Sequence, residues 1–130
     1  MSFKDDYHIT GSNVHIKAKN FDDAFKAIKK ACGDQVEYGL DCSEAENLID
    51  ALKELGWYSI VQKGDIRRLW TEEYISCEGS QKALEALIPF VEHGSWIECK
   101  SEYDEIWRYV FRPDRIEEIY PSLTWPDMGF

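Results

Sequence analysis

Residues 48–70 read LIDALKELGWYSIVQKGDIRRLW, and this stretch decides the fold. Its first part carries apolar residues at helical spacing, namely Leu48, Ile49, Leu52 and Leu55. Gly56 supplies a helix stop, and the pattern then changes abruptly to strand composition at residues 57–61. Residues 63–65, Lys-Gly-Asp, are typical of a tight turn, and residues 66–71 return as the partner strand. The stretch therefore predicts a helix followed at once by a hairpin.

Residues 84–109, LEALIPFVEHGSWIECKSEYDEIWRY, repeat this organisation. The second helix carries an apolar face made of Leu84, Leu87, Ile88 and Val91. Pro89 interrupts this face, and because proline lacks a backbone donor we expect the helix to kink or end near Ile88. The corner Gly94-Ser95-Trp96 then opens a second hairpin, with strands at about residues 96–100 and 105–112.

The two helix-hairpin stretches are interpreted as α-β-β repeat units covering approximately residues 43–77 and 80–112. Two copies are too few for a solenoid, so we expect them side by side in one antiparallel sheet with helices on one face. The spacing of Ser43 and Glu46 predicts a capping box at the start of the first helix, and Ser80 is the expected cap of the second.

The segments on either side complete the predicted domain. Residues 7–19 suggest one strand or a short hairpin with a turn at residues 11–13, followed by a helix that Asn20 caps and Gly33 stops. That helix has an apolar face made of Phe21, Ala24, Phe25, Ile28 and Cys32. Residues 115–120 add a further strand after a Pro-Asp turn, and residues 121–130 form an irregular tail. The prediction is a single α+β domain over residues 1–130, in the order β-α-α-β-β-α-β-β(-β).

Composition excludes several classes of protein. The chain has 130 residues, of which 44% are hydrophobic and 14% aromatic, so it is not of the disordered type. Its first residues are polar and no apolar run is long enough to span a bilayer, which favours the cytoplasm. The cysteines, at Cys32, Cys42, Cys77 and Cys99, form no Cys-x-x-Cys pair and are expected to be reduced.

The formal net charge of −10 disfavours direct binding to nucleic acid or to an anionic membrane. It favours a basic protein partner instead, although solubility alone would also account for it. The oligomeric state stays open, and an exposed hairpin edge would permit dimerisation.

No catalytic or cofactor motif is present in the sequence. The three histidines, His8, His15 and His93, lie in no recognisable signature, no third ligand is indicated for a metal, and no glycine-rich phosphate loop occurs. Glu98, Asp104 and Glu105 could converge near one hairpin, but such clusters usually face water. We therefore expect no cofactor, no metal and no enzymatic activity.

Strand alternation assigns the faces of the second hairpin. Trp107, Tyr109 and Phe111 share one face and bury the larger apolar area, so they are expected in the core. The opposite, open face carries Ile106, Arg108, Val110 and Arg112. Carried over to the first hairpin, the same alternation assigns Leu69 and Thr71 to the core and Ile66, Arg68 and Trp70 to the open face.

The open face is therefore a candidate partner-binding surface. It would place Arg68 and Trp70 beside Arg108 and Arg112, and these residue types are enriched in interface hot spots. Glu98, Asp104 and Glu105 complete the candidate set. The alternative is that the arginines form cross-strand ion pairs with Glu98, Glu117 or Glu118.

The stretch from Pro89 to Phe111 also carries a family resemblance. Its segments PFV, GSWIE and WRYVF resemble those of a widespread group of small acidic bacterial proteins. In size and charge, members of this group look like immunity proteins that neutralise secreted toxins. Residues 102–104, Glu-Tyr-Asp, depart from the group because a glycine-containing turn is expected there.

Together these patterns favour a non-catalytic acidic binding protein, most plausibly an immunity or inhibitor protein that neutralises a basic toxin or nuclease. One alternative is a phage-type anti-defence protein whose carboxylates mimic nucleic acid. Another is a module or enzyme that takes a small anionic ligand in a pocket at the Arg and Trp surface.

Overall fold

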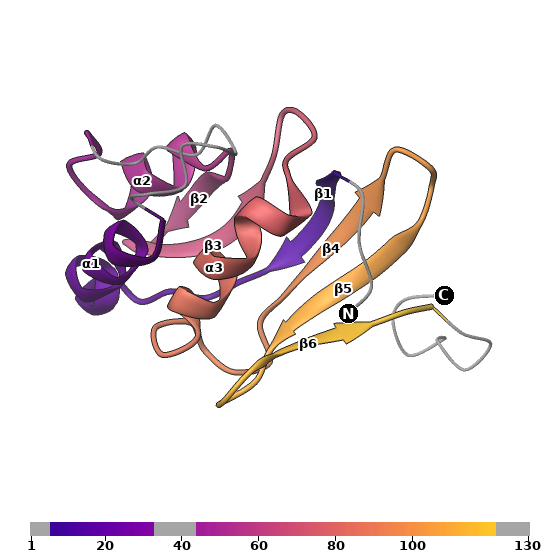
Figure 1. The fold of residues 1–130 in the computed structure, drawn as a ribbon. Coiled ribbons are helices and arrows are strands. Elements are labelled where there is room, and N and C mark those ends of the chain that lie inside the picture. Colours follow the sequence, from indigo (N-terminus) through magenta and orange to yellow (C-terminus); the bar gives the residue numbers. More distant parts are fainter. Residues whose placement is uncertain (1–5, 33–43, 122–130) are drawn as a thin grey trace.

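The computed structural model describes residues 6–32 and 44–121, and its fold is α+β (Figure 1). In chain order the elements are β1 (Tyr7–Asn13), the 3-10 helix η1 (Ala18–Asn20), α1 (Phe21–Cys32), α2 (Leu48–Glu54), β2 (Tyr58–Gln62), β3 (Asp65–Trp70), α3 (Cys77–Leu87), β4 (Trp96–Ser101), β5 (Ile106–Phe111) and β6 (Ile116–Ile119). The predicted order of helices and strands is confirmed. The predicted tail beyond residue 121 lies outside the described residues.

The strands form two antiparallel sheets rather than the single sheet expected from the repeat. One sheet has the order β1-β4-β5-β6, and the hairpin of β2 and β3 forms the other. The second repeat unit therefore pairs with the N-terminal strand and not with the first unit. The helices pack over the sheets, with α3 crossing in front of β3 and β1 (Figure 1).

Backbone and side-chain hydrogen bonds join β3 to the free side of β1 and to the residues that follow β1. The backbone N–H groups of Ile16 and Ile66 each donate to the other residue's carbonyl oxygen, both at 3.0 Å. Further along, Ser12 replaces a backbone pair: its Oγ donates to the carbonyl of Leu69 at 2.8 Å and accepts from the Leu69 N–H at 3.0 Å. The two hairpins thus lie on opposite sides of β1.

The N-terminal strand runs through the turn that was predicted at residues 11–13, so that prediction is wrong. The register of β1 against β4 shifts between Ile9 and Gly11, which is an irregularity of the β-bulge kind. The Trp96 ring lies over Gly11, with the Trp96 Cζ3 atom at ordinary van der Waals distance, 4.0 Å, from an ideal Cβ position. The glycine therefore lies at a bulge instead of a chain reversal.

Helix α1 occupies the predicted residues, whereas α2 begins later than the capping box predicted. Ser43 lies outside the described residues, and the observed cap is Asn47, whose side chain accepts a hydrogen bond from the Asp50 N–H at 2.9 Å. The predicted stop at Gly56 is confirmed, with φ at +95°. The N–H groups of Gly56 and Trp57 bond the carbonyls of Lys53 and Leu52, which is the Schellman arrangement.

Helix α3 starts three residues before the predicted cap, Ser80. That serine lies within the first turn, where its Oγ donates to the Cys77 carbonyl at 3.1 Å and is 2.9 Å from the Tyr7 hydroxyl. Serine is favoured at helix N-caps, but inside a helix its hydroxyl can also donate to a backbone carbonyl of the preceding turn, as Ser80 does. The early end near Ile88 is confirmed, since α3 stops at Leu87 ahead of Pro89.

The predicted core face of β5 is confirmed, because Trp107, Tyr109 and Phe111 are fully buried. Leu69 and Thr71 are also buried as predicted, but the assignment of Ile66 to the open face is wrong. Ile60 is paired with Arg68 and Val61 with Ile66, so Arg67 is an extra residue on β3. That extra residue reverses the alternation and turns Ile66 inward.

Candidate functional site

The structure brings together two of the predicted site residues, Arg108 and Glu98, on the open face of the larger sheet. The Nε of Arg108 donates to Glu98 Oε1 at 3.1 Å, and Thr10 donates to the other Glu98 oxygen at 3.0 Å. The guanidinium also lies over the Trp96 ring, 3.9 Å from its centroid. With only 11% of its side chain exposed, Arg108 is already engaged within its own sheet.

Arg112 behaves in the same way. Its Nε donates to Glu117 Oε1 at 2.7 Å, across the pair of β5 and β6. For both Arg108 and Arg112, therefore, the structure shows the ion pairs with glutamates of neighbouring strands that were the alternative interpretation. Pairs as exposed as that of Arg112 contribute little to stability, so they hold the side chains without fixing the fold.

Arg68 and Trp70 occupy a separate exposed surface on the smaller sheet. Trp70 stacks on Tyr58 with ring centroids 4.8 Å apart, and Arg68 is paired across the hairpin with Ile60. We name Tyr58, Ile60, Arg68 and Trp70 the hairpin face. The expectation that Arg68 and Trp70 lie beside Arg108 and Arg112 is wrong, because β1 and β4 lie between β3 and β5.

Asp104 and Glu105 belong to a cluster of carboxylates that three chain segments bring to one end of the sheets. Tyr7, the first residue of β1, is paired with Ser101 at the end of β4 and bonds Ile75 after β3. The turns after β3 and β4 project at the end where β1 starts (Figure 1). The exposed carboxylates that we name the acidic end are Asp6, Glu72, Glu73, Glu102, Asp104 and Glu105.

Two exposed tyrosines lie among these carboxylates. The side chain of Tyr103, at the tip of the β4–β5 turn, is 77% exposed, and Tyr74, in the turn after β3, is 45% exposed. The Tyr74 ring makes an edge contact with His8, with centroids 4.7 Å apart. Aromatic residues are enriched at protein interfaces, and no pattern in the sequence singles out these two.

The β4–β5 turn is held in a defined shape although its side chains face solvent. The buried Ser101 hydroxyl accepts from the N–H groups of Tyr103 and Glu105, both at 3.1 Å. Asp104 has φ at +65°, a conformation that favours glycine. A carboxylate-bearing residue therefore occupies a left-handed position in this turn. A non-glycine residue held in this conformation carries backbone strain, which is a feature common at functional sites.

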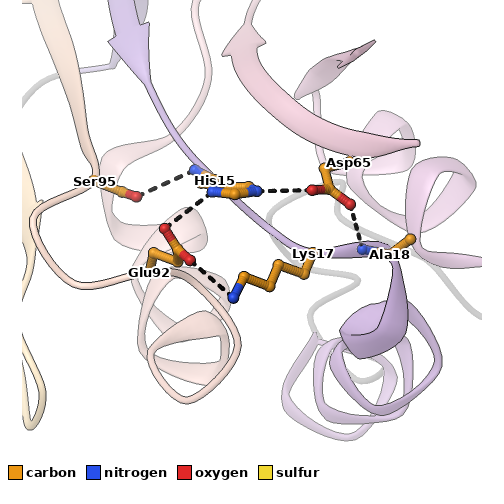
Figure 2. Close-up of polar contacts among 6 residues, drawn as sticks. All are labelled: His15, Lys17, Ala18, Asp65, Glu92 and Ser95. Atoms are coloured by element: carbon orange, nitrogen blue, oxygen red, sulfur yellow. Dashed lines mark hydrogen bonds and ion pairs between the residues drawn. The ribbon is translucent and has the colours of Figure 1, made fainter. Parts of the chain in front are cut away.

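A second polar cluster centres on His15, between the two sheets (Figure 2). Its Nε2 lies 2.9 Å from Asp65 Oδ2 and its Nδ1 lies 3.0 Å from Glu92 Oε2. Lys17 Nζ lies 3.3 Å from the other oxygen of Glu92. No sequence pattern indicates this cluster, because Asp65 and Glu92 are 50 and 77 residues from His15 along the chain.

The hydrogen bonds around His15 lower the pKa of both carboxyl groups. For Asp65 the main cause is the hydrogen bond with His15, followed by the one from the Ala18 N–H. For Glu92 the main cause is Lys17, with His15 adding to it, while desolvation opposes both effects. Both acids are therefore held in their ionised form.

His15 links two carboxylates and is not placed to activate a nucleophile. We name His15, Asp65 and Glu92 the clamp. Each ring nitrogen already lies within hydrogen-bond distance of a carboxylate oxygen, Nε2 of Asp65 and Nδ1 of Glu92. No ring nitrogen is then left to take a proton from a nucleophile. Ser95 is close by, but its Oγ accepts from the His15 backbone N–H at 3.2 Å and does not face the ring.

A shallow groove of about 530 Å³ lies next to this clamp. It is lined by Lys17, Lys19, Asn20 and residues 89–93. Neither Trp70 nor any of the predicted arginines lines the groove, so it is not the pocket that a small anionic ligand would require at the Arg and Trp surface.

The buried interior contains thiols next to tyrosine hydroxyls. Cys77 Sγ lies 3.0 Å from the Tyr109 hydroxyl, and Cys32, Cys77 and Cys99 are free and buried. Burial is the main cause that raises the pKa of both Tyr7 and Tyr109. Within residues 6–32 and 44–121, no three His, Cys, Asp or Glu side chains are grouped so as to hold a metal ion.

Comparisons with protein-family models, with curated proteins and with solved structures gave no match. In the part of the chain that the structure describes, no helix is long and apolar enough to cross a membrane.

Proposed function

We propose that this chain is a non-catalytic inhibitor or immunity protein that binds a basic toxin or nuclease through its acidic end. The observation that carries the proposal is the meeting of exposed carboxylates from three segments around the exposed ring of Tyr103. None of these groups lies in the core, so packing does not explain why they meet.

Electrostatics supports a basic partner. The net charge is −10, and the acidic end gathers six exposed carboxylates, of which Asp104 pairs with Lys100 at 3.3 Å. Such a surface attracts a positively charged protein over a distance of about a Debye length, roughly 8–10 Å in physiological salt. Complementary charge of this kind mainly accelerates association and selects against partners of the wrong sign.

Tyr103 supplies the apolar part of the contact. Its side chain is exposed, but Ser101 holds its backbone in place. A tyrosine on a fixed turn loses little conformational entropy on binding, and it combines a large apolar ring with a polar hydroxyl. This is the behaviour expected of an anchor residue at the centre of an interface.

The family resemblance agrees with this proposal. The resembling stretch ends its first strand just before residues 102–104, where this chain departs from the pattern with Glu102, Tyr103 and Asp104. A loop that differs on a hairpin common to the group would give each protein its own partner, because the scaffold stays constant while the loop changes.

Mimicry of nucleic acid is a second candidate, and the clustering of the carboxylates at one end favours it. A nucleic-acid mimic would bind the positively charged site of its partner and compete with DNA or RNA there. An inhibitor that binds elsewhere on the partner would not compete.

The test is co-purification with, and inhibition of, the product of the gene adjacent to its own. The proposal expects a basic protein that binds this chain more weakly as salt is raised and loses its toxic or nuclease activity in the complex. Absence of binding and inhibition would remove the main support. Competition by DNA for the same complex would select mimicry over inhibition at another site.

A further inference from the structure

The two sheets end in outer strands of opposite character. Strand β6, Ile116–Ile119, carries Glu117 and Glu118 among its four residues. Strand β2, Tyr58–Gln62, has no charged residue among its five. Charged side chains on an edge strand discourage pairing with another chain, so β6 is protected in this way and β2 is not.

Strand β2 is also apolar and exposed. Ile60 and Val61 are 40% and 43% exposed, and because successive strand residues point to opposite faces, they present apolar surface on both sides of the strand. Among the described residues, β3 is the sole strand that pairs with β2.

The adjoining hairpin face has the composition of a contact surface. The stacked rings of Tyr58 and Trp70 lie next to the pair of Ile60 and Arg68. Arg68 is exposed and makes no ion pair within the described part of the chain, in contrast to Arg108 and Arg112. Aromatic residues and arginine are the types that most often carry binding energy.

We propose that β2 is a self-association edge, where a second copy of this chain adds its own β2 in antiparallel fashion. Two molecules that each carry a charge of −10 repel each other over most of their surfaces, and β2 offers an edge without like charges. A twofold axis at Ile60 places Ile60 opposite its copy, Tyr58 opposite Gln62 and Ser59 opposite Val61. Every pair across this interface is uncharged, so no like charges face each other within the paired strands.

The pairing would join two hairpins into one four-stranded sheet across the dimer. It satisfies the outward N–H and C=O groups of β2 with those of the second copy. It would also extend the hairpin face of each copy into one continuous surface. The proposal is independent of partner binding at the acidic end, because it uses a different edge and different residues.

The test is sedimentation equilibrium of the full chain over a wide range of concentration. We expect a monomer–dimer equilibrium for the wild type and its loss in Ile60→Lys, which places like charges opposite each other at the twofold axis. Ile106→Lys is the matched control, because Ile106 is similarly exposed, at 37%, but lies in β5, which has a strand on each side. The control should dimerise as the wild type does.

Circular dichroism checks that both variants keep the fold. Val61→Lys, at the neighbouring position of the same strand, should also give a monomer. A wild type that sediments as a monomer throughout would overturn the proposal. So would a dimer that persists in a folded Ile60→Lys protein.

Discussion

The imidazole Nε2 of His15 lies 2.9 Å from Oδ2 of Asp65, and this contact joins the chain that leaves β1 to the first residue of β3. The other oxygen of Asp65 accepts from the Ala18 N–H at 2.9 Å, so one carboxylate holds the exit from β1 and the start of η1 (Figure 2). The clamp therefore fixes the relation between the two sheets at the end away from the acidic end.

Replacement of His15 by alanine should destabilise the protein. The variant loses its hydrogen bonds to both carboxylates and leaves two negative groups near each other. We expect a loss of about 1 kcal/mol in the free energy of unfolding, which urea denaturation at neutral pH would measure. His93→Ala is the control, since His93 is exposed and makes no such contact, and it should leave the unfolding curve unchanged.

Acid should weaken the clamp. The pKa of Asp65 is lower in the folded protein than its ordinary value near 3.8, so its contribution to stability is present above that pH and is lost as pH falls through the folded-state value. Asp65→Asn removes this titration but keeps an oxygen for the Ala18 N–H. The urea midpoints of wild type and variant should differ at pH 6 and converge below about pH 4. A constant difference across this range would contradict the assignment.

Two glycines with similar backbone angles should respond differently to alanine. Gly56 and Gly64 have φ at +95° and +87°, so a Cβ strains the backbone at both. At Gly56 the Cβ would also lie 2.6 Å from Ile75 Cγ2, whereas at Gly64 nothing lies within 4 Å. We expect Gly64→Ala to cost about 1 kcal/mol and Gly56→Ala clearly more. Equal changes in thermal midpoint would show that the Ile75 contact is absent or easily relieved.

Alkaline titration should distinguish the buried tyrosines. Burial raises the pKa of Tyr7 and Tyr109 above the ordinary value of 10. A raised folded-state pKa stabilises the protein below pH 10, and this stability is lost at higher pH because the unfolded state ionises first. Tyrosinate absorbance should therefore show a late component that appears together with unfolding. A Tyr7→Phe and Tyr109→Phe double variant should lack it, and immediate, complete ionisation of the wild type would contradict the burial.

Local signals predicted the elements of this fold well. Three signals that span only a few residues each made predictions that the structure confirms. They are the change of period around Gly56, the proline after α3 and the alternation of core residues in β5. The error at Ser80 arose because serine forms several local hydrogen bonds, and a four-residue window does not show which one is made.

Long-range relations could not be predicted in the same way. The extra residue Arg67 reverses the face of Ile66, and the Ser12 side chain joins β1 to β3, yet neither leaves a periodic trace in the sequence. The candidate site also depends on long-range contacts. Its charges were visible as composition, but their meeting at one end depends on the pairing of Tyr7 with Ser101 and its bonds to Ile75.

The central claim is that the acidic end binds a basic protein, and charge reversal tests it with a matched control. The variant Glu72→Lys, Glu73→Lys and Glu102→Lys reverses three exposed charges at the acidic end. The control Glu44→Lys, Glu46→Lys and Glu54→Lys reverses three exposed charges at or beside α2, and so changes the net charge equally.

The most direct measurement is the affinity of these two variants and the wild type for the product of the adjacent gene, by isothermal titration calorimetry at fixed salt. We predict a fall of about a hundredfold or more for the acidic-end variant, roughly 3 kcal/mol, and a far smaller change for the control. Equal losses in both variants would mean that net charge alone matters. Unchanged binding in the acidic-end variant would contradict the account.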